Sequence, residues 1–134
     1  AAAARLMADN PQLQVLVPAA NPACRAQLQP LLEAAALPPG RVQLLDGQAR
    51  TCMEAADVVM LASGTATLET MLVKRPMVVG YKVAPSTAKL VRALGLLKVK
   101  RFALPNVLAD KDLAPELIQE DCTPEALAAA RQLE

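Results

Sequence analysis

Residues 57–69 read Asp-Val-Val-Met-Leu-Ala-Ser-Gly-Thr-Ala-Thr-Leu-Glu, and this stretch decides the fold. The first six of them, 57–62, are nearly all apolar and predict a buried strand. The small residues 63–65 end the strand, and residues 66–73 predict a helix. Because apolar strands that lead directly into helices build parallel sheets covered by helices, this stretch predicts an α/β fold.

Apolar runs alternate with helical patterns along the rest of the chain. Further strands are predicted at residues 13–17, 42–45, 76–81 and 102–104. Helices are predicted from Pro22, with Asn21 as the side-chain cap, to the Pro38-Pro39-Gly40 stop, and at residues 49–56, 86–94 and 111–119. A last helix is predicted at 124–133, with Thr123 as its cap. With right-handed crossovers, this order predicts a Rossmann-like parallel sheet with helices on both faces.

The composition fits one globular domain. The 134 residues are 54% hydrophobic and 20% charged, which is enough apolar material for a single core. We therefore expect one domain over residues 1–134, with no internal repeat or linker. Both ends of the sequence fall within helical patterns, so we expect this domain to be a fragment of a larger chain.

Several classes of function are excluded by the composition. The sequence contains no histidine, which excludes histidine metal sites, Ser-His-Asp triads and histidine acid–base chemistry within this chain. A net charge of +1, with one Tyr, one Phe and no Trp, argues against a nucleic-acid partner. The three cysteines are widely spaced and predict reduced thiols, and no apolar run reaches the length of a membrane span. We expect no metal and no cofactor.

The turn after the strand at 57–62 predicts an anion-binding loop. Gly64 has no side chain, so a ligand can approach the backbone closely. The following helix offers unpaired N–H groups and the positive end of its dipole. Ser63, Thr65 and Thr67 add hydroxyl groups to this turn. Glu69 lies one turn further, where a carboxylate could accept both hydroxyls of a ribose.

The same residues also fit a plain capped helix, with Thr65 as the N-cap and Glu69 facing solvent. The P-loop pattern G-x-x-x-x-G-K-[ST] is absent, and no G-x-G-x-x-G follows the first strand. The residues alone leave both interpretations open.

Four linked blocks of the sequence resemble the lipid-A-disaccharide synthase family. They read Leu-Leu-Asp-Gly at 44–47, Ala-Ser-Gly-Thr-Ala-Thr-Leu-Glu-Thr-Met-Leu at 62–72, Pro-Met-Val-Val-Gly-Tyr at 76–81 and Leu-Pro-Asn-Val-Leu-Ala at 104–109. The segment Gln-Glu-Asp-Cys at 119–122, followed by Thr-Pro, is similar to the family's Q-E-x-C segment. The resemblance covers nearly the whole chain and implies the carboxyl-terminal, donor-binding half of a two-domain GT-B glycosyltransferase.

The resemblance also implies an activity, a location and a set of partners. Members of the family transfer 2,3-diacylglucosamine from UDP to 2,3-diacylglucosamine 1-phosphate with inversion. They act on the cytoplasmic side of the inner membrane of Gram-negative bacteria, peripheral to an anionic membrane surface. The catalytic carboxylates belong to the amino-terminal half, so we expect no catalytic residue here and no activity from this fragment alone. A homodimer of the full-length protein is compatible with the family.

The resemblance implies roles for seven residues. The substrate-binding residues would be Ser63, Gly64, Thr65, Ala66 and Thr67 at the diphosphate, Glu69 at the ribose and Asn106 at the mouth of the site. The Asn106 amide would bond sugar or phosphate oxygens, although without the resemblance it would be an ordinary turn residue. Two alternatives remain for the whole chain, a UDP-N-acetylglucosamine 2-epimerase-like domain and a non-catalytic, flavodoxin-like nucleotide-binding module.

Residues 86–101 combine positive charge with leucines and contain no acidic residue. The five cations are Lys89, Arg92, Lys98, Lys100 and Arg101. A basic, apolar surface suits an anionic membrane leaflet, whereas an amphipathic helix followed by a solvated basic loop would have the same sequence.

We expect this segment to bring the protein to anionic bilayers. Each cation near such a surface contributes roughly 1 kcal/mol before screening, so binding should weaken as salt is added. Co-sedimentation with anionic vesicles should show weaker binding when all five cations are changed to Gln. Equal binding of both proteins at low salt would contradict a membrane role for the segment.

Overall fold

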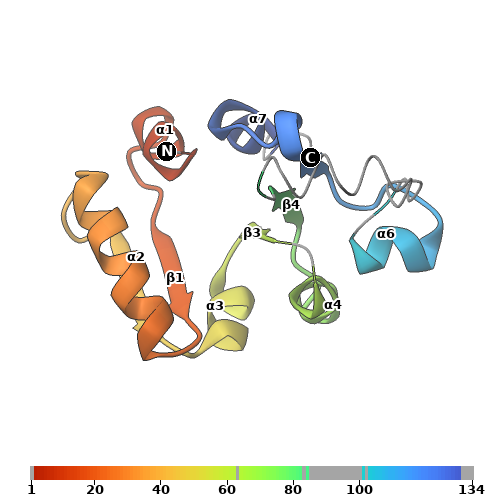
Figure 1. Cartoon of the computed structure of the whole chain (residues 1–134), viewed down its shortest axis with the longest axis horizontal. Helices are drawn as coiled ribbons and strands as arrows, with labels where there is room; N and C mark the ends of the chain where they lie inside the picture. The colour runs from red at the N-terminus through yellow and green to blue at the C-terminus, as the bar shows by residue number, and fades with distance from the viewer. Residues whose placement is uncertain (1, 63, 83, 85–100, 102, 131–134) are drawn as a thin grey trace.

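Strands and helices alternate along the chain in the computed structural model, which describes residues 2–62, 64–82, 84, 101 and 103–130 (Figure 1). In order, the elements are α1 (Ala2–Asp9), β1 (Val15–Ala19), α2 (Pro22–Ala34), β2 (Val42–Asp46), α3 (Ala49–Ala55), β3 (Val59–Leu61), α4 (Thr65–Leu72), β4 (Met77–Tyr81), α6 (Leu104–Ala109), β5 (Glu116–Ile118), the 3-10 turn η2 (Gln119–Asp121) and α7 (Pro124–Ala129).

The described strands form two open parallel sheets. In the first, β1 pairs with β2, from Val15 opposite Val42 to Ala19 opposite Asp46. In the second, β4 lies between β3 and β5 and is parallel to both. The predicted α/β fold with parallel strands is therefore confirmed and is consistent with a Rossmann-like half of a GT-B protein. The described strands are nevertheless divided between two sheets rather than joined in one.

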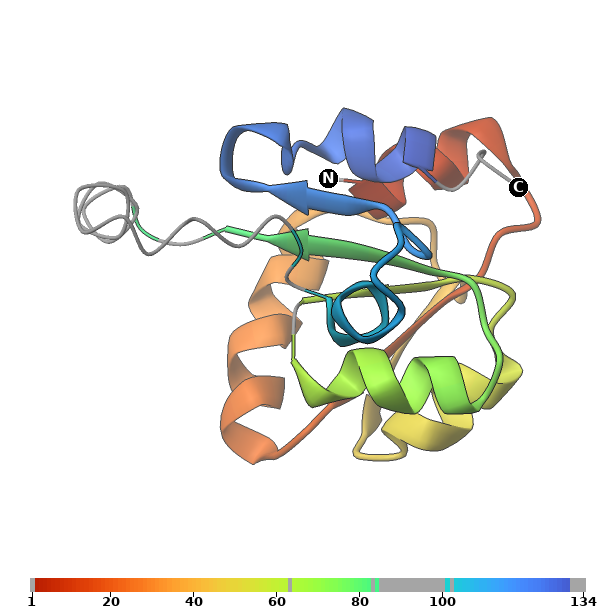
Figure 2. The same cartoon turned by 90° about the vertical axis from the view of Figure 1, so that its right-hand side faces the viewer.

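Helices cover both faces of the β3-β4-β5 sheet. Figure 2 shows α4 and α6 on one side of this sheet and α7, with α1 beside it, on the other. The buried cluster between these layers contains Met77 and Val79 from β4 together with Ala103 and Ala114. Because β4 is buried on both faces, its apolar sequence has no alternation, which is why it was readable as a strand.

Gly80 allows α7 to approach β4 closely. A methyl group at this position would lie 2.9 Å from Leu127 Cδ2 and 3.1 Å from Cys122 Sγ. These distances are shorter than a normal contact between heavy atoms, so the absent side chain leaves room for the Leu127 side chain on the sheet.

Two helices begin as their sequences predict. The Asn21 side chain accepts a hydrogen bond of 2.9 Å from Cys24 N at the start of α2, and Pro22 is the first helical residue. Thr123 caps α7 in the same way: its hydroxyl accepts a hydrogen bond of 3.1 Å from Ala126 N, and Pro124 is the first helical residue. Side-chain caps are local interactions, and this is why the sequence alone could place them.

Two predictions near the C-terminal end of the chain were wrong. The strand predicted at 102–104 is absent at its described residues, because Ala103 is the N-cap of α6 and Leu104 begins that helix. The helix predicted at 111–119 is also wrong, because this segment contains β5 and begins η2. Pro105 at the first turn cannot donate to a strand ladder and instead suits a helix start.

Other differences are smaller, and some predictions cannot be compared. The strand predicted at 13–17 lies two residues later and includes Pro18, which a strand with one partner can accommodate. The helix predicted at 86–94, Ser63, Phe102 and the end of the helix predicted at 124–133 lie outside the described residues.

Arg41 holds the end of α1 and the following loop against the start of β2. Its Nη2 donates to Asn10 O at 2.7 Å and to Leu13 O at 2.8 Å, and its Nε donates to Leu13 O at 3.0 Å. A planar guanidinium suits such a fan of acceptors, which the single ammonium of lysine could not reach together. Arg5 and Glu125 add an ion pair between α1 and α7.

We expect Arg41→Ala to lower the free energy of unfolding by about 1–3 kcal/mol, because partly buried carbonyls lose their donor. Urea unfolding monitored by circular dichroism measures this change. Arg50→Ala is the control, because it removes an exposed ion pair and should leave the unfolding curve almost unchanged. Equal unfolding curves for the two variants would contradict a stabilising role for the hydrogen bonds of Arg41.

Candidate functional site

The turn between β3 and α4 depends on a backbone conformation that only glycine adopts readily. Gly64 is the N-cap of α4, with φ 132° and ψ −164°. A Cβ at Gly64 would meet nothing within 4 Å, so the requirement is conformational and not steric. The open space leaves the backbone of this turn accessible to a ligand.

Thr67 shapes the turn from inside. Its side chain is fully buried. Its hydroxyl donates a hydrogen bond of 2.6 Å to Gly64 O, and its backbone N–H donates one of 3.1 Å to the same oxygen. Thr70, also buried, donates from its hydroxyl to Ala66 O at 2.9 Å. The predicted contact between the Thr67 hydroxyl and a ligand stays a prediction, and it would require the bond to Gly64 to be exchanged.

The start of α4 differs from the starts of α2 and α7, which Asn21 and Thr123 cap with their side chains. Gly64 gives α4 no side-chain cap, and α3 and α6 share this feature because Gln48 and Ala103 make none. At α6, a carboxylate oxygen of Glu116 accepts from the backbone N–H of Ala103. A helix start without a side-chain cap can direct its N–H groups and dipole at an external anion.

Glu69 is exposed on α4 and lies near a cation from α3. The hydrogen bond to Glu54 chiefly raises the pKa of Arg50, and the negative charges of Glu54 and Glu69 raise it further. Arg50 Nε lies 2.8 Å from Glu54 Oε1. Among the described site residues that the sequence predicted around this turn, Thr65 and Glu69 have exposed side chains.

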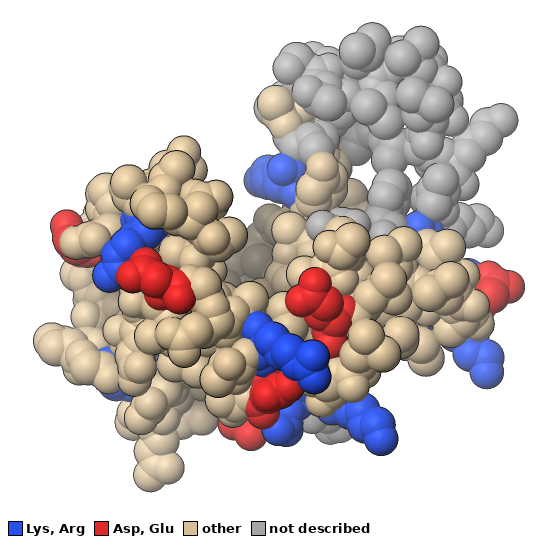
Figure 3. All heavy atoms as spheres, turned by 90° about the horizontal axis from the view of Figure 1, so that it is seen from below, with Lys and Arg blue, Asp and Glu red and all other residues tan. Residues whose placement is uncertain are grey.

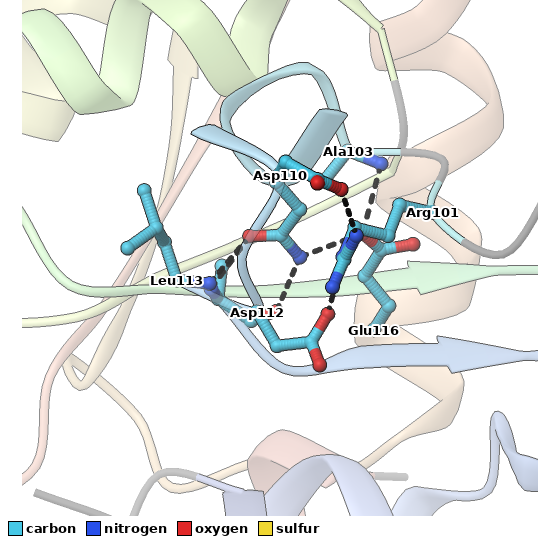
Figure 4. Close-up of polar contacts among 8 residues, drawn as sticks. Arg101, Ala103, Asp110, Asp112, Leu113 and Glu116 are labelled. Atoms are coloured by element: carbon cyan, nitrogen blue, oxygen red, sulfur yellow. Dashed lines mark hydrogen bonds and ion pairs between the residues drawn. The ribbon is translucent and has the colours of Figure 1, made fainter. Parts of the chain in front are cut away.

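Asn106 is buried and does not open toward solvent. It is 1% exposed, and its amide makes four hydrogen bonds within the chain (Figure 4). The nitrogen donates to Ala114 O at 2.8 Å and to Glu116 Oε1 at 2.7 Å, and the oxygen accepts from Leu113 N at 2.7 Å and Ala114 N at 2.9 Å. The structure places Asn106 at the start of α6 rather than at an open mouth, and a substrate contact by its amide stays a prediction.

Arg101, the one described cation of the basic segment 86–101, is held in ion pairs. Its Nη1 lies 2.6 Å from Asp110 Oδ1 and its Nε lies 2.7 Å from Asp112 Oδ1. The hydrogen bond to Asp112 is the largest cause of the raised pKa of Arg101. The charge of Arg101 is therefore compensated by these two carboxylates, and Arg101 does not add a free positive charge to the segment.

Figure 3 shows one face of the molecule, on which acidic and basic side chains are intermixed without a continuous field of one sign. Within the part of the chain that is described, no group of three or more Cys, Asp or Glu residues is placed to hold a metal ion. No helix in that part is long and apolar enough to cross a bilayer.

The sequence model of the lipid-A-disaccharide synthetase family matches residues 1–134. The chain belongs to this family. A protein of Xanthomonas campestris pv. campestris named lipid-A-disaccharide synthase is 67% identical over 129 residues, which are 96% of this chain and 30% of that protein. A Xylella fastidiosa protein of the same name is 60% identical over 129 residues, covering 96% of this chain and 34% of the relative. The chain thus spans about a third of the length of these relatives.

Family membership confirms the resemblance and leaves the role of each residue to be tested. Glu116 and Arg50 were not among the predicted site residues, and Glu116 fell inside a predicted helix. Glu116 acts on Ala103 and Asn106, which belong to the start of another element. Arg50 pairs with Glu54 at the i,i+4 spacing of its own helix, but no local signal showed that it lies near Glu69 of α4.

We expect Gly64→Ala to destabilise the protein by about 1–3 kcal/mol, because an L-residue is strained at this φ and ψ. Gly47, with φ 64°, is the matched control. Asn should be tolerated at position 47, where the left-handed region suits it, and should not rescue position 64. Thermal unfolding of the three variants measures the difference, and equal tolerance of Asn at both positions would contradict this account.

Proposed function

We propose that this chain is the donor-binding half of a lipid-A-disaccharide synthase with GT-B architecture. In this role it binds UDP-2,3-diacylglucosamine, whose diacylglucosamine is transferred with inversion to 2,3-diacylglucosamine 1-phosphate. Membership of the family and the names of the relatives support this function. The structural observation that carries it is the helix start after Gly64, which has no side-chain cap.

The diphosphate of the donor binds at the start of α4. Residues 63–67 surround it, with the N–H groups of Thr65 and Ala66 directed at its oxygens and the Thr65 hydroxyl beside them. The positive end of the helix dipole favours the anion, and Gly64 leaves the approach free of a Cβ.

Glu69 binds the ribose. Its exposed side chain lies one turn further along α4, and an ionised carboxylate has acceptor sites for two hydroxyl groups. Arg50 lies near Glu69, but its hydrogen bond and ion pair are with Glu54.

The other half of the enzyme supplies the acceptor site and the catalytic carboxylates, so this chain alone does not transfer sugar. The protein works at the cytoplasmic face of the inner membrane of a Gram-negative bacterium, where its lipid substrates reside. The proposal also includes a homodimer of the full-length protein. No observation favours the 2-epimerase or the flavodoxin-like alternative.

We expect Glu69→Ala to weaken UDP binding by about 1–3 kcal/mol, because the ribose loses a charge-assisted hydrogen bond. Isothermal titration calorimetry with UDP measures this loss. Glu33→Ala is a matched control. Glu33 lies on α2, not on α4, and accepts a hydrogen bond from Gln29 of the same helix. Wild-type affinity in Glu69→Ala would remove Glu69 from the site, and no affinity in the wild-type protein would refute UDP binding itself.

A further inference from the structure

A partly buried hydrogen-bonded group, which we call the α6 clasp, holds the beginning of α6 against β5. It consists of Asn106, Glu116 and the backbone groups of Ala103, Leu113 and Ala114 that these two side chains bind (Figure 4). One oxygen of Glu116 accepts from Ala103 N at 3.1 Å and from Asn106 Nδ2 at 2.7 Å. Glu116 therefore connects residues that are ten and thirteen positions away from it in the sequence.

Glu116 performs from another element a task that usually belongs to a helix itself. In a capping box, the side chain at the third helical position bonds the N–H of the N-cap residue. Here the third helical residue is Asn106, which binds the loop at 113–114, and the N–H of the N-cap residue Ala103 is bound by Glu116 from β5. A carboxylate at a helix start is also favoured by the helix dipole.

The clasp is linked to the candidate site through packing. Ala103 and Ala114, which it holds, belong to the buried cluster formed with Met77 and Val79 of β4. The helix α6 lies beside α4 in both Figure 1 and Figure 2 and packs against it. A displacement of α6 would therefore disturb the helix whose first turn forms the candidate site.

We propose that Glu116 is a positioning residue for nucleotide binding, acting through Asn106 and α6 on the α4 turn. This inference rests on the proposed function of that turn. It also gives Asn106 a second way to affect binding, by fixing α6, that needs no contact with the ligand. A direct contact and a positioning role predict different results when Glu116 is removed.

The test is a double-mutant cycle in the intact protein with UDP as the probe. We expect Asn106→Ala and Glu116→Ala each to weaken UDP binding about tenfold, a size typical of indirect coupling. The double variant should be no weaker than either single variant, because both remove the same clasp. Glu116→Gln retains an acceptor oxygen and should bind UDP within about twofold of wild type.

Titrations are made well below the unfolding temperature of the least stable variant. Glu125→Ala is the control, since it removes a surface carboxylate whose ion pair with Arg5 joins α7 to α1. Glu125→Ala should leave UDP affinity unchanged. Wild-type affinity in Glu116→Ala would overturn the proposal and favour a direct contact by Asn106.

Hydrogen exchange separates failure of this inference from failure of the proposed function. Glu116→Ala should speed exchange at the amides of Leu113 and Ala114, which the clasp holds, and also at Thr67 N–H on α4. Exchange at the Arg25 amide of α2 should not change. Faster exchange at Thr67 would support the coupling even if wild-type protein binds no UDP, and unchanged exchange there would overturn it.

Discussion

The burial of β4 is the constraint on which the rest of the structure depends. Met77, Val78 and Val79 are each at most 9% exposed, so this strand must be covered on both faces and paired at both edges. Helices α4 and α6 satisfy one face, and α7 satisfies the other by reaching the position of Gly80. The two edges are taken by β3 and β5, which are only three residues long and depend on β4 for their pairing.

The buried polar side chains of the described residues make hydrogen bonds within the chain. Thr67 and Thr70 bond back to their own helix, and Asn106 is saturated by the loop at 113–114 and by Glu116. These bonds satisfy groups that would be costly to leave unpaired. The start of α4 has no side-chain cap, a feature that it shares with α3 and α6, and the exposed Thr65 and Glu69 beside Gly64 are what distinguish it as the candidate site.

Features encoded by neighbouring residues could be predicted from the sequence, and features encoded by distant ones could not. The cap at Asn21 and the glycine turn before α4 involve residues within three or four positions, and both were found. In contrast, β5 is too short to show a pattern and exists because β4 offers it an edge. Glu116 binds Asn106 across ten residues, so a helix predicted over 111–119 hid this partner of a predicted site residue.

Under the proposed function, the α4 turn needs additional positive charge to hold a diphosphate. A helix start supplies roughly half an elementary charge, which is less than the negative charge of a nucleotide diphosphate. Arg50 is engaged with Glu54, and Arg101 is engaged with Asp110 and Asp112, so neither brings a free charge. Lys82 is exposed directly after β4, at the same edge of the parallel sheet as the α4 turn. If the proposed function holds, Lys82 is the described cation placed to supply part of the remaining positive charge.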